Sequence, residues 1–208
     1  MNFDFSDEQK QLQDQARRFL ADKCPPSAVR AVLEGGQTYD RALWIELGEM
    51  GFLGAAIPEE FGGVGLGHLE LCVIAEELGR AIAPVPVSSS IYLAAEFLLA
   101  AGSEDQKRAW LPKLASGETI GTFAYGEGLG RVTETSIKAS VAGGKLSGTK
   151  TPVPDGEIAD VAVVAAREGG KVSLDRFELN GPGVTRETVE SIDPTRGQAV
   201  LTFKDAPA

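Results

Sequence analysis

The spacing of apolar side chains changes character near residue 117. Before this point, apolar residues recur every three to four positions, which is typical of helices that bury one face. Leu12, Ala16 and Phe19 follow this spacing and predict the first helix. The full set of predicted helices is one that Ser6 and Gln9 cap and Pro25-Pro26 ends, one from Ser27 to about Glu34, one from Asp40 to Gly51, one from about His68 to Arg80, one from Ile91 to Ala101, and one that Ser103 and Gln106 cap and Pro112 bends or ends.

A glycine-rich loop separates the third and fourth predicted helices. It contains Gly62, Gly63, Gly65 and Gly67. Glycine loses much backbone entropy when it is ordered, so such a run usually marks left-handed turns or a close approach of the backbone to a ligand. The dinucleotide fingerprint G-x-G-x-x-G requires a preceding strand and a third glycine in register, and this loop has neither. We therefore predict a structural turn between helices.

From Thr119 on, alternating and β-branched residues replace the helical spacing. Glycine- and proline-containing turns separate the runs, which favours an antiparallel barrel or sandwich. The predicted fold class is α+β and multidomain, with an N-terminal all-α bundle over residues 1–117 and a β-barrel or sandwich domain over residues 118–208. Residues 91–101 are apolar nearly all round and are expected inside the bundle. The candidate strands are Thr119–Tyr125, Ser136–Val141, Lys145–Ser147, Val161–Ala166, Val172–Phe177, Val184–Val189 and Ala199–Phe203.

Composition limits the classes of function. The formal net charge is −10, from 20 basic and 30 acidic residues, which argues against binding to nucleic acid or to an anionic membrane. No uncharged apolar stretch approaches the roughly 20 residues of a membrane span. The N-terminus lacks the apolar run of a signal peptide. Cys24 and Cys72 are too few for a disulfide framework or a zinc site, so we expect a cytoplasmic protein.

The residues alone give no catalytic constellation. His68 is the only histidine, which excludes a histidine metal cluster, and no Gly-x-Ser-x-Gly nucleophile elbow is present. Lys150 and Arg196 lie near turn signals and are candidates to meet an anionic ligand, although an exposed, solvated charge is the ordinary expectation for both. No catalytic residue and no metal ligand is assigned from the sequence.

A series of short motifs, in order along essentially the whole chain, resembles the N-terminal and middle domains of acyl-CoA dehydrogenases. No single motif is specific, but their number and order are. The motifs include Leu47-Gly48-Glu49-Met50-Gly51, Ile57-Pro58-Glu59-Glu60-Phe61-Gly62-Gly63, Gly102-Ser103-Glu104-Asp105-Gln106-Lys107, Leu146-Ser147-Gly148-Thr149-Lys150 and Asp193 through Arg196.

The resemblance implies a flavoprotein oxidoreductase of lipid metabolism. Such an enzyme carries out FAD-dependent α,β-dehydrogenation of an acyl-CoA thioester: a glutamate base takes the α proton and the flavin accepts the β hydride. It passes electrons to an electron-transfer flavoprotein or a similar acceptor, and it works as a homo- or hetero-oligomer. The family's base lies in a C-terminal helical domain beyond these 208 residues. This chain alone is therefore expected to be inactive, being either a fragment or one of two polypeptides.

The resemblance also assigns the cofactor-binding positions. The strand of the family that meets the flavin corresponds to Phe123, Tyr125 and Gly126, with Gly126 in place of a threonine hydroxyl. The family's Trp-Ile-Thr corresponds to Pro152-Val153-Pro154, and proline provides neither a hydroxyl nor a backbone N–H. These replacements support an alternative, a non-catalytic, flavin-poor partner subunit of a heteromeric acyl-CoA dehydrogenase.

Overall fold

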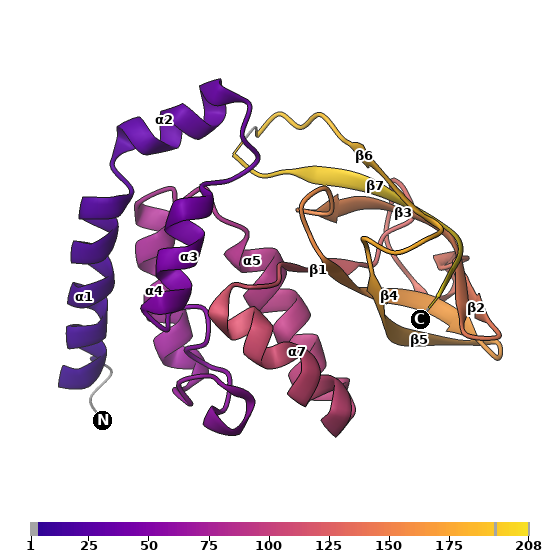
Figure 1. Ribbon diagram of the computed structural model, residues 1–208, viewed down its shortest axis with the longest axis horizontal. Helices are drawn as coiled ribbons and strands as arrows, with labels where there is room; N and C mark the ends of the chain where they lie inside the picture. The colour runs from indigo at the N-terminus through magenta and orange to yellow at the C-terminus, as the bar shows by residue number, and fades with distance from the viewer. Residues whose placement is uncertain (1–3, 194, 208) are drawn as a thin grey trace. The chain divides into compact units, whose positions relative to one another are not determined.

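The computed structural model describes residues 4–193 and 195–207. It has an N-terminal helical region followed by a mixed β-sheet, which confirms the predicted fold class (Figure 1). Contacts divide the chain into two compact units. The helical unit is the chain up to Val85 together with Arg108–Glu118, and the sheet unit is Pro86–Lys107 together with the chain from Thr119 on. The predicted boundary after residue 117 stays a prediction about folding domains.

Local sequence signals explain where the helices of the helical unit begin. The Ser6 hydroxyl accepts from the Gln9 amide N–H, and the Gln9 side chain accepts from the Ser6 N–H, as a capping box requires. The Asp40 carboxylate caps the third helix by accepting from the Leu43 backbone N–H over 3.0 Å. The helix that contains Pro112 does not end there but continues to Ser116. The elements are α1 (Asp7–Lys23), α2 (Pro26–Gly35), α3 (Arg41–Glu49), η1 (Glu59–Phe61), α4 (His68–Arg80) and α7 (Glu104–Ser116), of which α7 is divided between the units.

Polar bonds join α1 to α4. Gln9 donates to Glu70 over 2.7 Å, and Arg17 donates to both carboxylate oxygens of Glu77 over 2.7 and 3.0 Å. The later residue of α1, Arg17, contacts the later residue of α4, Glu77, so the two helices run parallel. Glu77 is only 1% exposed and also meets Arg80 at 3.2 Å. The hydrogen bond from Arg17 is the main reason why the pKa of the Glu77 carboxyl lies below its usual value.

The glycine loop is a structural turn, as predicted. Gly62 and Gly65 have φ of 79° and 72°, the left-handed region that favours glycine. A Cβ on Gly63 would lie 2.0 Å from the carbonyl oxygen of Ile57, so no side chain fits there. The close approach that this glycine permits is to the chain's own backbone.

The sheet unit contains a mixed seven-stranded sheet with strand order β1-β4-β2-β3-β7-β6, and β5 pairs with β4. The expectation of a purely antiparallel arrangement is wrong, because β1 and β2 both run parallel to β4. β1 and β2 therefore run in the same direction on either side of β4. Strands that run in the same direction need a crossover connection rather than a tight hairpin, and the segment from Tyr125 to Ala139 makes this connection. The strands are β1 (Gly121–Ala124), β2 (Ser140–Ala142), β3 (Lys145–Pro154), β4 (Val161–Glu168), β5 (Lys171–Glu178), β6 (Val184–Thr188) and β7 (Gln198–Pro207).

The apolar segment expected inside the helical bundle belongs to the sheet unit instead. It forms α5 (Val87–Ser89), η2 (Ser90–Ala95) and α6 (Glu96–Ala101), and these elements contact β1. Ser90 accepts a hydrogen bond from the Gly121 N–H over 3.0 Å, which ties η2 to the start of β1. No helix in the described part of the chain is long and apolar enough to cross a membrane.

We expect Glu77→Gln to lower the free energy of unfolding by about 1–2 kcal/mol at neutral pH, because charge-assisted bonds to a buried carboxylate are lost while both arginines stay partly in water. Since the pKa of Glu77 is lowered by folding, its contribution is present above the usual carboxyl pKa and is lost as the pH falls through the folded-state value. The difference from the unsubstituted protein should therefore shrink in acid.

Denaturant unfolding followed by Trp44 fluorescence measures this, because Trp44 is buried in the same unit. The matched control is Glu76→Gln, which removes a neighbouring carboxylate whose side chain is 53% exposed. Equal losses in the two variants would contradict a special role for Glu77.

Candidate functional site

The structure brings together the two segments that the sequence assigned to the cofactor. The Thr151 N–H donates to the Gly126 carbonyl, and the Gly128 N–H donates to the Thr151 carbonyl, each over 2.9 Å. The Thr122 hydroxyl donates to the Pro154 carbonyl over 2.5 Å. Phe123, Tyr125 and Gly126 therefore lie along one side of this junction, and Pro152, Val153 and Pro154 lie along the other. Their role in binding a cofactor stays a prediction.

Aromatic rings form a short column beside this junction. Phe97 of α6 stacks on Phe123 of β1 with ring centroids 4.2 Å apart, and Phe123 stacks on Tyr125 at 5.5 Å. Phe123 and Tyr125 share a face because side chains alternate along an extended segment. Tyr125 ends the column and is 39% exposed. The column thus offers one accessible aromatic ring.

The polar groups of the six positions are few and mostly occupied. The Gly126 and Pro154 carbonyls accept the hydrogen bonds described above. Val153 is fully buried and pairs with Ala199 of β7. A Cβ on Gly126 would lie 3.1 Å from the Thr151 carbonyl oxygen, so a larger residue there requires a small shift of its neighbour. Among the six positions, Tyr125 is the one residue whose side chain has a hydrogen-bond donor, its hydroxyl group.

This donor set does not fit a flavin that is held by its polar edge. The edge of the isoalloxazine ring is a row of acceptors with one N–H, and a protein holds it through donors. Here glycine and proline occupy the positions that would provide them. The aromatic column suits stacking alone. We therefore derive no redox step through these residues.

Lys150 is fully buried, contrary to the expectation of a solvated charge. Its Nζ lies 2.7 Å from a carboxylate oxygen of Glu127 and 3.3 Å from the Tyr125 carbonyl oxygen, to which it donates. The signal for burial was present in β3, where Leu146 is buried, Thr149 is exposed and Lys150 is buried again. Burial lowers the pKa of the Lys150 ammonium, and the Glu127 carboxylate opposes this shift.

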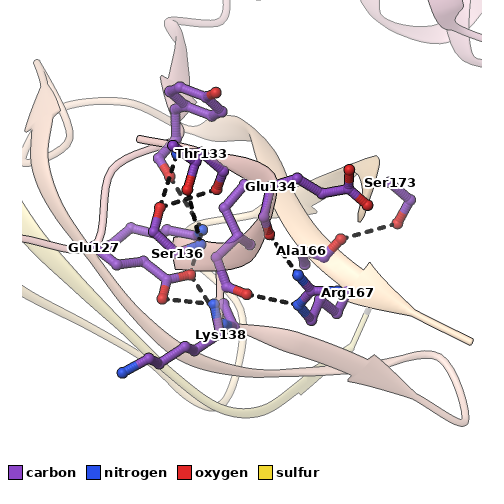
Figure 2. Close-up of polar contacts among 12 residues, drawn as sticks. Glu127, Thr133, Glu134, Ser136, Lys138, Ala166, Arg167 and Ser173 are labelled. Carbon is purple, nitrogen blue, oxygen red and sulfur yellow. Dashed lines mark hydrogen bonds and ion pairs between the residues drawn. The ribbon is translucent and has the colours of Figure 1, made fainter. Parts of the chain in front are cut away.

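Glu127 also binds the far end of the loop that it begins. Its two carboxylate oxygens accept from the backbone N–H groups of Lys138 and Ala139 over 2.8 and 2.9 Å, and Figure 2 shows this closure. Burial alone would raise the pKa of the Glu127 carboxyl. The hydrogen bonds from Lys150, Ala139 and Lys138 outweigh burial, so the pKa lies below its usual value.

A second cation holds the same loop through carbonyl groups. Arg167 of β4 donates to the carbonyl oxygens of Ile137 at 2.7 Å and Gly170 at 3.2 Å, and also to that of Glu134 (Figure 2). A guanidinium group presents several donors in a fixed plane, which suits it to holding several carbonyls. The segment 134–139 is thus fixed by Arg167 and by Glu127.

Arg196 is also engaged within the chain rather than by solvent alone. Its guanidinium meets Asp155 at 2.9 Å and donates to the Ser88 hydroxyl. Asp155 is buried and accepts from the Ser89 hydroxyl over 2.5 Å. These bonds join the α5 segment to the ends of β3 and β7. Sequence analysis missed this network because its members are far apart in the chain.

The family described as "Acyl-CoA dehydrogenase, N-terminal domain" matches residues 6–118, more than half of the sequence. The chain belongs to the acyl-CoA dehydrogenase family. It is 36% identical over 168 residues to the mitochondrial isovaleryl-CoA dehydrogenase of Pongo abelii, which is 78% of this chain and 40% of that relative. The chain thus spans well under two thirds of the length of this relative.

Solved structures are also similar to this chain. The ChsE4-ChsE5 complex from Mycobacterium tuberculosis matches with a TM-score of 0.88 and 28% identity, over 100% of this chain and 57% of that one. An acyl-CoA dehydrogenase complexed with FAD from Bacillus anthracis matches with a TM-score of 0.87 and 27% identity, over 99% of this chain and 37% of that one. The structures similar to this chain therefore include one that is complexed with FAD and one that is a complex of two different proteins, ChsE4 and ChsE5.

We expect Thr122→Val to destabilise the chain by about 1 kcal/mol, because the change keeps the shape of a buried side chain but removes the donor to the Pro154 carbonyl. Thermal unfolding followed by circular dichroism measures the loss. Thr149→Val is the matched control, since Thr149 is exposed and its hydroxyl lies 3.4 Å from that of Thr202. An equal or smaller loss in Thr122→Val would show that the bond does not hold the junction together.

Proposed function

We propose that this chain takes part in α,β-dehydrogenation of an acyl-CoA thioester as the flavin-poor partner subunit of a heteromeric acyl-CoA dehydrogenase. Family membership supports the class of reaction. Similarity to the ChsE4-ChsE5 complex supports an assembly of unlike subunits. The observation that carries the proposal is the donor set at Gly126, Pro152 and Pro154, where the chain offers no side-chain hydrogen bond to a flavin.

In this proposal the chain contributes surface rather than chemistry. No residue of the 208 is assigned as the base that removes the α proton, and the hydride acceptor is held by other residues of the assembly. The chain supplies its helical unit, its sheet and the exposed ring of Tyr125. The remaining parts of the proposal are a flavin-containing partner chain, an electron-transfer flavoprotein or similar acceptor, and action in the cytoplasm.

A second candidate function is that the chain binds FAD itself, as an ordinary subunit of an FAD-dependent acyl-CoA dehydrogenase. The specific observation in its favour is the aromatic column, because the stacked rings of Phe123 and Tyr125 offer a face to a planar ligand. Similarity to the acyl-CoA dehydrogenase complexed with FAD points the same way. The two candidates differ in whether FAD accompanies this chain.

We expect the protein, purified as the cell produces it and then separated from any partner chain, to be colourless and to release no FAD when it is denatured. The reason is the lack of side-chain donors at the three replaced positions. A visible spectrum and fluorescence of the denatured supernatant measure this. A yellow chain with stoichiometric FAD would overturn the partner proposal and establish the second candidate.

Variants that restore the hydroxyl groups test the same reasoning from the other side. Gly126→Thr combined with Pro154→Thr should increase the FAD that the chain retains on gel filtration. The matched control is Gly35→Thr, at a glycine of the helical unit where a Cβ meets nothing within 4 Å. If FAD retention is the same in the variant and the control, the missing donors are not what sets flavin affinity.

A further inference from the structure

The buried ammonium group of Lys150 has no role in the function proposed so far. Its side chain is 0% exposed, although removing such a charge from water is costly unless it is paired and hydrogen-bonded. An apolar residue in a strand interior would be accommodated without this cost. The contacts of Lys150 therefore indicate what the charge provides.

Lys150 and its neighbour Thr151 together contact each residue of the segment from Tyr125 to Gly128, in which Glu127 forms a parallel bridge to Thr151. Lys150 binds the carbonyl of Tyr125 and the carboxylate of Glu127. Thr151 binds the carbonyl of Gly126 and the N–H of Gly128. Two adjacent residues of β3 thus determine the path of the chain as it leaves β1, and Lys150 does so with a side chain that can span the gap and bind two oxygens.

The segment from Tyr125 to Gly128 carries the one exposed ring of the aromatic column, that of Tyr125. The Tyr125 carbonyl that accepts from Lys150 belongs to the residue whose ring ends the column. The hydrogen bond from Lys150 therefore restrains the peptide group that follows Tyr125, and with it the backbone from which the ring extends. The ammonium group lies on the backbone of Tyr125 and not on its ring, so it leaves the ring accessible.

The carboxylate of Glu127 extends this control to the rest of the loop. By accepting from the amides of Lys138 and Ala139, it places the end of the loop next to its beginning. Arg167 then binds the Glu134 and Ile137 carbonyls from β4 (Figure 2). The charged groups that hold the backbone on either side of this loop, Lys150, Glu127 and Arg167, all belong to the sheet unit.

We propose that Lys150 is a positioning residue, which orients the exposed Tyr125 ring through the Tyr125 carbonyl, with Glu127 as its counter-charge. This inference rests on the proposed function only in that the surface around Tyr125 is the one the enzyme uses. If the pair had a purely structural role, it would contribute to stability, and any neutral pair that restored stability would serve as well.

Fluorine NMR of 3-fluorotyrosine separates these two roles. The 208 residues contain three tyrosines, Tyr39, Tyr92 and Tyr125, and Tyr125→Phe assigns the resonance of interest. The labelled chain is studied as purified, with its partner chains if it has any. The variants are Lys150→Met and the double variant Lys150→Met with Glu127→Gln. The matched control is Lys138→Gln, which removes an exposed positive charge from the same loop while keeping the backbone N–H.

We expect Lys150→Met to lower the thermal stability, because the mostly shielded Glu127 carboxylate is left without its counter-charge. The double variant should recover much of this stability because no unpaired charge remains. In both variants the Tyr125 resonance should shift by more than its linewidth, while the Tyr39 resonance in the helical unit stays in place. The control should leave both resonances unchanged.

Return of the Tyr125 resonance to its original position in the double variant would overturn the proposal, since the pair would then act on stability alone. If Lys150→Met does not fold, the double variant still gives this result. The measurement involves neither flavin nor acyl-CoA, so its outcome is independent of whether the proposed function holds.

Discussion

An ammonium group shielded from water must be close to a negative charge, and in the sheet unit this requirement determines the course of a long connection. Lys150 of β3 requires Glu127, and Glu127 in turn binds the amides that lead into β2. The chain that leaves β1 is thereby returned so that β2 also lies along β4, parallel to it. The same ion pair therefore holds the start of this connection against β3 and, through Glu127, against the residues that lead into β2.

Glycine serves the same physical purpose in both units, namely a close approach of the chain to itself. Gly63 lies against the Ile57 carbonyl, and a Cβ on Gly148 would lie 2.6 Å from the Cβ of Ala139. The second contact packs β3 against the end of the loop that Glu127 closes. Glycine at Gly126 likewise accompanies a backbone contact, with Thr151. Gly63, Gly126 and Gly148 therefore each allow the chain to pack closely against its own backbone or side chains.

What the sequence predicted correctly was local. Capping pairs such as Ser6 with Gln9 act within a few residues, and each of the seven candidate strands overlaps an observed strand because alternation is visible within each run. The bounds are less accurate: the second candidate overlaps β2 only at Ser140 and Val141, and the third ends at Ser147 whereas β3 continues to Pro154. The parallel pairing of β1 with β4, and the place of the α5 to α6 segment against β1, depend on partners far along the chain. No short pattern contains that information.

The candidate site was predictable only in part and by a different route. Glycine and proline have no reactive groups, so Gly126, Pro152 and Pro154 were found through resemblance to a family, and the structure then placed them side by side. The burial of Lys150 was readable from the alternation in β3, but its partner was not, because Glu127 lies on a loop without periodicity. The sequence marked Arg196 as a candidate to meet an anionic ligand, but its partner Asp155 was not predictable because the two residues lie far apart in the chain.

The division of the chain into units has a consequence for the order of events during synthesis. The helical unit includes Arg108–Glu118, and the Trp44 indole N–H donates to the Gly117 carbonyl over 2.8 Å. A ribosome that has released only the first 85 residues has therefore not yet supplied the segment that completes this unit. The α5 to α6 segment emerges in between, well before the strands against which it packs. The apolar surface of this segment stays exposed until the sheet has been translated, and during this period chaperones can bind it.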